Sequence, residues 1–214
     1  MKNLSLYFLR HGQTALTRDN VYCGAGMEPE LTAAGHAMAR AFADFYKAKS
    51  WAAIHVSPQL RTRQTAAPLC AALGVEPALG DGWKEIAYGR WEGLPLLEIE
   101  RQFPDDYRRW IADPAWHAPT GGELATTVAR RALQELEKIR TQHRAGNVLI
   151  VSHKATIRVI LCALLGIEVG RFRSRLSCPI GSVSIVEFTS RGPLLQALGD
   201  RQHLPPELRG LDEA

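Results

Sequence analysis

Basic side chains suited to binding phosphate follow three predicted strands of this 214-residue chain. Arg10 and His11 come directly after the first apolar segment, and Arg61 and His153 lie just beyond two later ones. Ligands of parallel α/β sheets bind at the carboxyl ends of the strands, so we expect these four side chains to converge. Two guanidinium groups can each make paired hydrogen bonds to a phosphate monoester dianion. The pattern therefore predicts an anion site.

His11 is the candidate nucleophile of such a site. Neighbouring arginine charge favours the neutral imidazole, and only the neutral ring has a lone pair with which to attack phosphorus. The attack would form a phosphohistidine and divide hydrolysis into two easier steps. The leaving alkoxide needs a proton, and Glu85, within KEIAYGRWEG, is the candidate donor. A positioned acid accelerates such a step by roughly 10²–10⁴-fold.

Alternating strand and helix patterns must position these groups. They predict an α/β fold: a three-layer sandwich with a mostly parallel central sheet, helices on both faces and a small cap insertion. The predicted strands are Leu4–Leu9, Ala53–Val56, Asn147–Val151 and a hairpin of Ser182–Phe188 with Leu194–Leu198. The predicted helices are Ala33–Lys47, Gln59–Leu73 with Pro58 at its start, Gly121–Arg144 and Ala155–Leu165.

Residues 81–122 differ from the rest of the chain, because they hold four of its five tryptophans. We predict that this segment is a cap within a single domain of residues 1–214. Arg108 and Arg109 lie in its second predicted helix. They either overhang the pocket and bind a second anionic group of the substrate, or face solvent.

Four motifs resemble the signatures of the histidine phosphatase (phosphoglycerate-mutase-like) superfamily. They are LRHGQT, SPQLRTRQTA, EIAYGRWEG and VSHKATIR, and they occur in the family's order between residue 4 and about residue 165. The resemblance implies that His11 is the nucleophile and that Glu85 is the proton donor. It further implies that Arg10, Arg61 and His153 bind the phosphoryl group, with no metal and no cofactor.

Two positions depart from the family pattern. Many members have SHGG at the second histidine, whereas this chain has Lys154 and Ala155 after His153. Lys154 either supplies an extra charge to the phosphate or faces solvent. Many members also have a phosphate-binding asparagine six residues after the nucleophile, where this chain has Thr17, whose hydroxyl could replace that contact.

Composition limits the partners and the compartment. With 26 basic and 22 acidic residues the net charge is only +4, which does not suggest a nucleic-acid binder. No segment reaches the roughly 18 apolar residues of a membrane helix, and the first apolar stretch is too short for a signal peptide. Four cysteines without C-x-x-C spacing suit a reducing compartment. We expect a cytoplasmic enzyme that acts on a small phosphorylated metabolite, with a homodimer possible.

The expected function is metal-independent phosphomonoester hydrolysis through a phosphohistidine. One alternative is a 2,3-bisphosphoglycerate-dependent phosphoglycerate mutase, which uses the same groups. The mutases of this family carry a Pro-rich insertion after an Arg-Arg pair in the cap, and no such insertion follows Arg108-Arg109. Hydrolysis is favoured because a short cap admits water more readily. A second alternative is a non-catalytic phosphate-binding protein, for which His11 and Glu85 together would be unnecessary. A metal site of His11, His153 and Glu85 lacks the usual ligand spacing, and Arg10 would repel a cation.

Overall fold

The first apolar segment forms the central strand β1 (Leu4–Arg10) of a mixed sheet in the computed structural model, which describes residues 3–211. Within these residues the sheet has six strands in the order β3-β2-β4-β1-β5-β6. The other strands are β2 (Trp51–Val56), β3 (Ala78–Leu79), β4 (Gly146–Ser152), β5 (Val183–Thr189) and β6 (Gly192–Asp200). The first four in this order are parallel to one another, whereas β5 runs antiparallel to both of its neighbours, β1 and β6. The predicted mostly parallel sheet and its C-terminal hairpin are confirmed.

Strand register aligns the carboxyl ends that carry the predicted site. Arg10 of β1 pairs with Ser152 of β4, and Val56 of β2 pairs with Val151 of β4. The residue that follows each strand therefore emerges at the same edge of the sheet. β1 and β4 are covered on both faces, which explains why both read as nearly continuous apolar runs.

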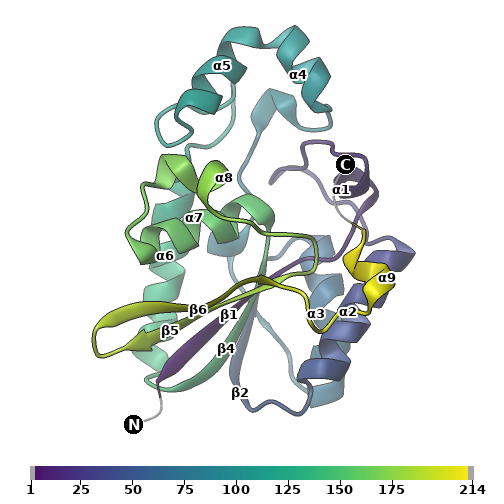
Figure 1. Ribbon diagram of the computed structural model, residues 1–214, viewed down its shortest axis with the longest axis vertical. Coiled ribbons are helices and arrows are strands. Elements are labelled where there is room, and N and C mark those ends of the chain that lie inside the picture. Colours follow the sequence, from purple (N-terminus) through teal and green to yellow (C-terminus); the bar gives the residue numbers. More distant parts are fainter. Residues whose placement is uncertain (1–2, 212–214) are drawn as a thin grey trace.

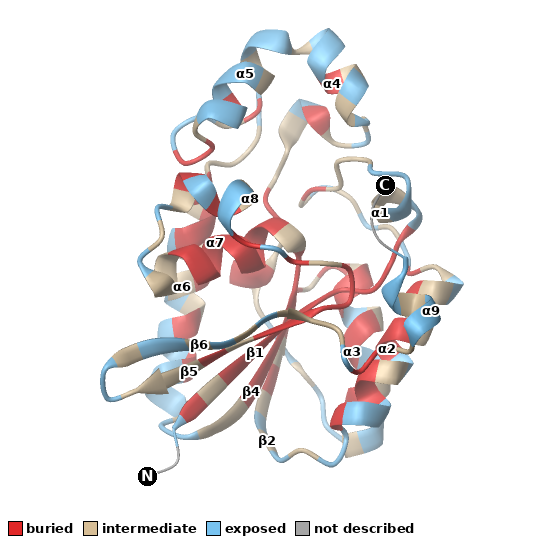
Figure 2. Ribbon diagram, in the orientation of Figure 1, coloured by how far each residue is buried: buried red, intermediate tan, exposed pale blue. Residues whose placement is uncertain are grey.

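Helices cover both faces of the sheet (Figure 1). One face is covered by α2 (Ala33–Tyr46) and α3 (Leu60–Leu73), and the other by α6 (Ala125–Gln142) and α7 (Lys154–Leu165). Each pair buries its own apolar cluster against the strands, and burial is concentrated along these contacts (Figure 2). The predicted helices on both faces are confirmed. No helix of residues 3–211 has the length and apolar character needed to cross a bilayer.

Two predicted helix starts are wrong. Pro58 is not the first helical residue, because α3 begins at Leu60 after an extended Gln59. The buried Gln59 amide donates to the carbonyl of Gly24, which holds this residue outside the helix. The next long helix begins at Ala125 rather than Gly121, because the Gly122 N–H closes a turn on the Pro119 carbonyl and the Glu123 N–H donates to the distant Ala87 carbonyl.

The segment of residues 81–122 contains four short helices. They are the 3-10 turns η1 (Asp81–Trp83) and η2 (Gly89–Trp91) and the helices α4 (Leu96–Gln102) and α5 (Pro104–Ala112). Its first part packs into the main core through Trp83, whereas α4 and α5 stand away from the sheet (Figure 1). Trp91, Ile99 and Trp110 form a separate buried cluster beneath α4 and α5. We retain residues 81–122 as the proposed cap of a single domain.

Short elements complete the described chain. They are α1 (Ala15–Arg18), the 3-10 turn η3 (Val169–Arg171), α8 (Phe172–Arg175) and α9 (Pro206–Arg209). Elements of this length have too few turns to show helical periodicity, which is why the sequence did not reveal them.

Buried His203 makes the stability of the fold sensitive to acid. Its ring packs against Phe42 and Tyr46, with ring centroids 5.4 and 6.0 Å away, and burial lowers its pKa to about 4. In the unfolded chain the imidazole has its ordinary pKa of about 6.5. The unfolded state therefore binds more protons between these values, so stability is complete above the unfolded pKa and falls as the pH drops toward 4.

We predict that His203→Leu reduces this acid sensitivity. Between pH 7.5 and pH 5 the parent chain should lose about 2 kcal/mol more of its unfolding free energy than the variant does. Urea unfolding at both pH values measures the difference. Other buried histidines contribute equally to both proteins, so parallel pH dependences would contradict the prediction.

Candidate active site

His11 lies at the carboxyl end of β1 with one ring nitrogen already engaged. Its Nδ1 is 2.8 Å from the carbonyl oxygen of Gly12, so Nδ1–H donates to that carbonyl and the lone pair resides on Nε2. Gly12 is required because a Cβ there would lie 2.6 Å from the backbone oxygen of Gly35 in α2. The close approach of β1 and α2 thus fixes the imidazole and its tautomer.

Buried positive charge keeps this imidazole neutral. Burial, the charge of Arg61 and the charge of Arg10, in that order, lower the pKa of His11 well below its ordinary value. The hydrogen bond to Gly12 acts in the opposite direction but does not outweigh them. A neutral ring with a lone pair on Nε2 is the form that a nucleophile requires.

His153 and Arg61 form the layer beside His11. The ring centroids of the two histidines are 5.2 Å apart. Arg61 Nε donates to His153 Nδ1 over 3.2 Å, so Nε2–H of His153 donates to Ser57 Oγ over 2.8 Å. Burial and then the charge of Arg61 lower the pKa of His153 well below its ordinary value. The structure therefore brings His153 and Arg61 together with His11, as the sequence predicts.

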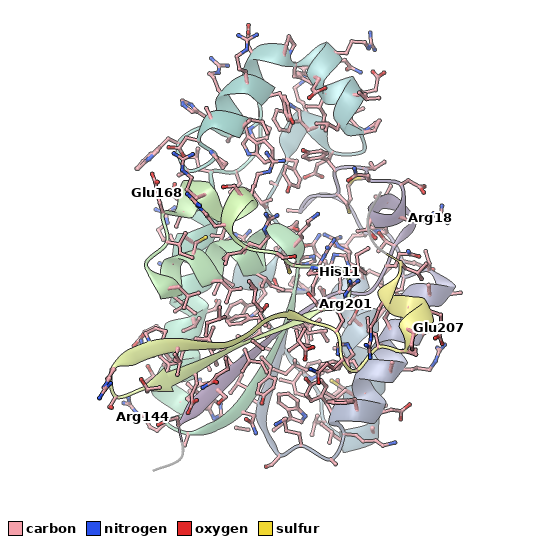
Figure 3. All side chains as sticks on the ribbon, viewed as in Figure 1. His11, Arg18, Arg144, Glu168, Arg201 and Glu207 are labelled. Carbon is pink, nitrogen blue, oxygen red and sulfur yellow. The ribbon has the colours of Figure 1, made fainter. Side chains whose placement is uncertain are left out.

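His11 contributes to the wall of a cavity of about 220 Å³. Figure 3 shows His11 between the strands of the sheet and the proposed cap. Arg10 and Glu85 also contribute to the wall of the cavity, whereas the buried Arg61 and His153 are not among its lining residues. Arg10 is 2% exposed, and its Nη1 donates to the Cys178 carbonyl over 2.8 Å. The cavity thus presents an imidazole, a guanidinium and a carboxylate side by side.

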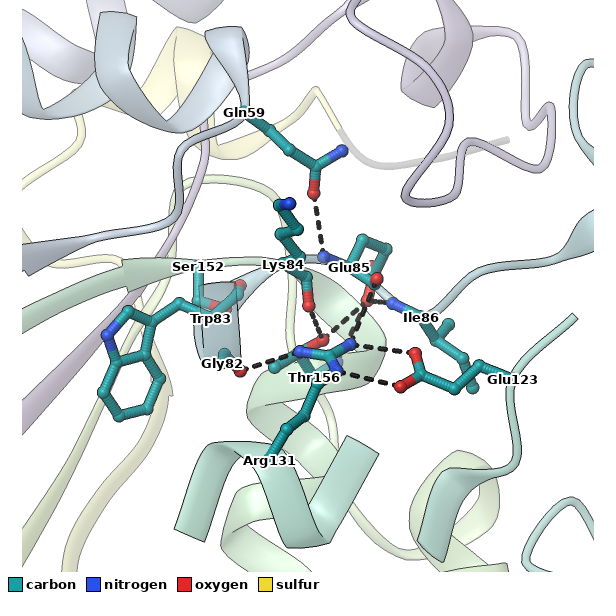
Figure 4. Close-up of polar contacts among 10 residues, drawn as sticks. All are labelled: Gln59, Gly82, Trp83, Lys84, Glu85, Ile86, Glu123, Arg131, Ser152 and Thr156. Atoms are coloured by element: carbon teal, nitrogen blue, oxygen red, sulfur yellow. Dashed lines mark hydrogen bonds and ion pairs between the residues drawn. The ribbon is translucent and has the colours of Figure 1, made fainter. Parts of the chain in front are cut away.

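The Glu85 carboxylate is bound to the first turn of α7 (Figure 4). Its Oε2 accepts from the Ala155 N–H over 3.2 Å, and its Oε1 accepts from the Thr156 N–H over 3.1 Å. The Thr156 hydroxyl lies 3.1 Å from Oε1 and 2.7 Å from the Lys84 carbonyl. A carboxylate at a helix N-terminus satisfies N–H groups that have no partner within the helix. These bonds fix the orientation of Glu85 in the wall.

Two side chains that the sequence did not reveal hold the backbone of Glu85. The Glu85 N–H donates to Gln59 Oε1 over 2.8 Å, and Arg131 Nη2 donates to the Glu85 carbonyl over 3.2 Å (Figure 4). Arg131 is itself held by Glu123 in an ion pair of 2.9 Å. Nothing in the local sequence marks these residues, because each acts on a segment distant in the chain.

Of the remaining predicted residues, Thr17 and Lys154 line the cavity, whereas Arg108 and Arg109 do not. The Thr17 hydroxyl forms hydrogen bonds at the N-terminal end of α1, where it accepts from the Thr14 N–H and donates to the Thr14 carbonyl.

The structure does not bring Arg108 and Arg109 to the cavity, and we remove both from the site. Their side chains are 77% and 62% exposed. They pair with Asp105 and Asp106, one turn earlier on α5.

Among the described residues no group of three or more His, Cys, Asp or Glu side chains could hold a metal ion.

Comparison with known proteins extends over nearly the whole chain. A family model described as the histidine phosphatase superfamily (branch 1) matches residues 6–201. Phosphoserine phosphatase 1 of Hydrogenobacter thermophilus is 30% identical over 201 residues, which are 94% of each chain. Glucosyl-3-phosphoglycerate phosphatase of Mycolicibacterium vanbaalenii is 30% identical over 176 residues, 79% of this chain and 77% of that protein.

The fold is also similar to that of solved structures. YhfR of Bacillus stearothermophilus superimposes with a TM-score of 0.86 at 26% identity, covering 94% of this chain and 98% of that one. The range matched by the family model, residues 6–201, contains every residue to which the sequence assigns a catalytic role.

The electrostatics of the site predict the titration of His11. In phosphate-free buffer its imidazole should remain neutral to well below pH 6.5, because burial and two arginines disfavour the cation. Histidine NMR signals followed against pH, and assigned with a His11→Ala variant, measure this. Protonation of His11 above the ordinary histidine value of about 6.5 would contradict the charge arrangement described above.

Proposed function

This chain belongs to the histidine phosphatase superfamily and is a phosphomonoester hydrolase, and on that premise we propose the roles of the residues at its cavity. His11 is the nucleophile, Glu85 is the proton donor, and Arg10, Arg61 and His153 bind the phosphoryl group. The observation that carries this assignment is the hydrogen bond from His11 Nδ1–H to the Gly12 carbonyl. It leaves the lone pair on Nε2 in a ring that lines the cavity beside Arg10.

The first step transfers the phosphoryl group to the enzyme. His11 Nε2 forms a bond to phosphorus while the bond from phosphorus to the ester oxygen breaks. The departing alkoxide takes the proton of Glu85 and leaves as an alcohol. The guanidinium groups of Arg10 and Arg61 stabilise the charge that the equatorial oxygens carry during transfer.

The second step returns the enzyme to its starting state. The Glu85 carboxylate takes a proton from water as the water oxygen attacks phosphorus. The bond between phosphorus and Nε2 breaks, inorganic phosphate leaves, and neutral His11 is restored. Thr17 and Lys154 lie where they can contact the phosphate or the alcohol portion of the substrate.

Water rather than a second alcohol is the acceptor in this proposal. A bisphosphoglycerate-dependent mutase would return the phosphoryl group to its substrate, and a binding protein would not transfer it. The names of the two relatives, a phosphoserine phosphatase and a glucosyl-3-phosphoglycerate phosphatase, support hydrolysis and suggest phosphoserine and glucosyl-3-phosphoglycerate for a substrate panel.

The four cysteines are free, which supports our placement of the enzyme in the cytoplasm. A homodimer remains a prediction.

We predict that His11→Ala abolishes hydrolysis. With chelator present, the parent chain should release phosphate from p-nitrophenyl phosphate, and the variant should lose more than about 10⁴-fold in kcat. His117→Ala, an exposed histidine outside the cavity wall, is the control and should retain activity. Rapid quenching in alkali should trap an acid-labile phosphoprotein in the parent only. Full activity of His11→Ala would refute the assignment of the nucleophile.

The role of Glu85 predicts a dependence on the leaving group. Glu85→Gln should lower kcat/KM, which reports phosphoryl transfer to His11 and not the shared second step, by roughly 10²–10⁴-fold for an alkyl ester such as glycerol 3-phosphate, because an alkoxide must be protonated. For p-nitrophenyl phosphate kcat/KM should fall by less than about tenfold, since p-nitrophenolate is a stable anion and leaves without a proton. Exposed Glu168→Gln serves as the control. Equal losses for both esters would show that Glu85 is not the acid.

A further inference from the structure

A second, basic groove adjoins the catalytic cavity. Its volume is about 810 Å³, and it shares Lys154, Arg158 and Arg173 with the wall of the cavity. It continues past Arg175 toward Arg201. Among the described residues that line either hollow, Glu85 is the only carboxylate, and its oxygens are bound to the first turn of α7. The shared part of the wall thus carries three cationic side chains.

Arg158 is a buried cation within this shared wall. It lies on the second turn of α7 and is only 9% exposed. One end of its guanidinium donates to the backbone carbonyl of Arg173, and its Cζ lies 5.5 Å from the ring centroid of Phe172. Its buried Nε has no hydrogen-bond partner within residues 3–211.

The charge of Arg158 has no counter-ion in the described part of the chain. None of the ion pairs there involves Arg158, and the charged arginines nearest in effect, Arg173 and Arg10, repel it. Burial therefore lowers its pKa. A buried charge without a partner is costly, and native proteins normally pair it. An anion arriving from solvent would supply the missing partner.

Arg173 provides a second cation at the same place. It belongs to α8, is partly exposed, and its Cζ stacks 4.1 Å from the ring centroid of Trp110 in the cap. No carboxylate of the described chain pairs with it, although Arg171, two residues earlier, pairs with Glu168. The aromatic contact holds Arg173 in the wall while its hydrogen-bond donors remain available to a ligand.

We propose that Arg158 and Arg173 form a subsite for a second anionic group of the substrate. The inference rests on the proposed phosphomonoesterase function and specifies its substrate class. Preferred substrates are phosphate monoesters of small alcohols that also carry a carboxylate or a second phosphate. Arg158 follows His153 by five residues, about 7.5 Å of helical rise. The subsite and the phosphoryl-binding histidine are therefore both carried by the N-terminal part of α7.

Equilibrium binding tests the subsite without requiring turnover. Calorimetry on the His11→Ala protein compares ligands that differ in one group. 3-Phosphoglycerate is matched with glycerol 3-phosphate, and fructose 1,6-bisphosphate with fructose 6-phosphate. The first pair tests a carboxylate, and the second pair tests a further phosphate. At least one dianionic ligand should bind about 10- to 100-fold more tightly than its partner, the range expected for hydrogen bonds to charged groups.

Arg173→Gln, added to His11→Ala, should reduce this preference at least tenfold. Arg171→Gln, an exposed arginine outside both hollows, should leave the preference unchanged. Arg158→Lys keeps the charge but loses the fork of donors, and should also reduce the preference. If Arg158 only supported α8, this variant would unfold at a lower temperature with the preference intact.

The outcomes separate this proposal from the general function. No preference in either pair, including no measurable binding, overturns the subsite, as does a preference that survives Arg173→Gln. Failure of the parent chain to hydrolyse p-nitrophenyl phosphate would reject the proposed function, but it would not affect the binding ratio. A preference confined to one ligand pair identifies the second group as a carboxylate or as a phosphate.

Discussion

Buried positive charge is the constraint on which the catalytic end of this protein depends. Arg61 is 1% exposed, and it is held by the carbonyl oxygens of Met27 and Gly24 and by His153, with no ion pair in residues 3–211. Carbonyl oxygens satisfy guanidinium donors without cancelling the charge. A carboxylate in their place would neutralise the group and compete with phosphate. The fold thus retains a charge that only an incoming anion balances.

Burial together with this charge explains the state of the histidines. The ring centroids of His11 and His153 are 5.2 Å apart, and burial, followed by the charge of Arg61, lowers the pKa of each imidazole. Neutrality gives His11 its lone pair and allows His153 to accept from Arg61. Bound phosphate would oppose the lowering by adding negative charge. The Nε2 lone pair of His11 is therefore already available when substrate arrives.

The sequence predicted the centre of the site because strand ends are local features. An apolar run followed by Arg10-His11 or Ser152-His153 indicates both a strand and the edge where it ends. The partners of Glu85 were not predictable, since Gln59 and Arg131 are distant from it in the chain and lack a distinctive pattern. The same holds for Arg158, which looks like one polar position in an apolar helix.

For Arg108 and Arg109 the sequence left two alternatives open, and the structure favours the exposed one. The stretch DDYRR places each arginine three residues after an aspartate on a helix, the spacing of a solvent-exposed ion pair. The helix start at Pro58 was mispredicted for a tertiary reason, because Gln59 is held outside α3 by its contacts with the segment around Gly24 and with Glu85.

Helix α7 connects the catalytic site with the proposed subsite. Its first turn binds the Glu85 carboxylate, His153 immediately precedes it, and its second turn carries Arg158. One buried helix therefore sets the position of the proposed acid, of the proposed phosphoryl-binding histidine and of the second cation together. In this proposal a substrate that binds Arg158 is aligned with both groups, so selectivity and alignment have the same structural origin.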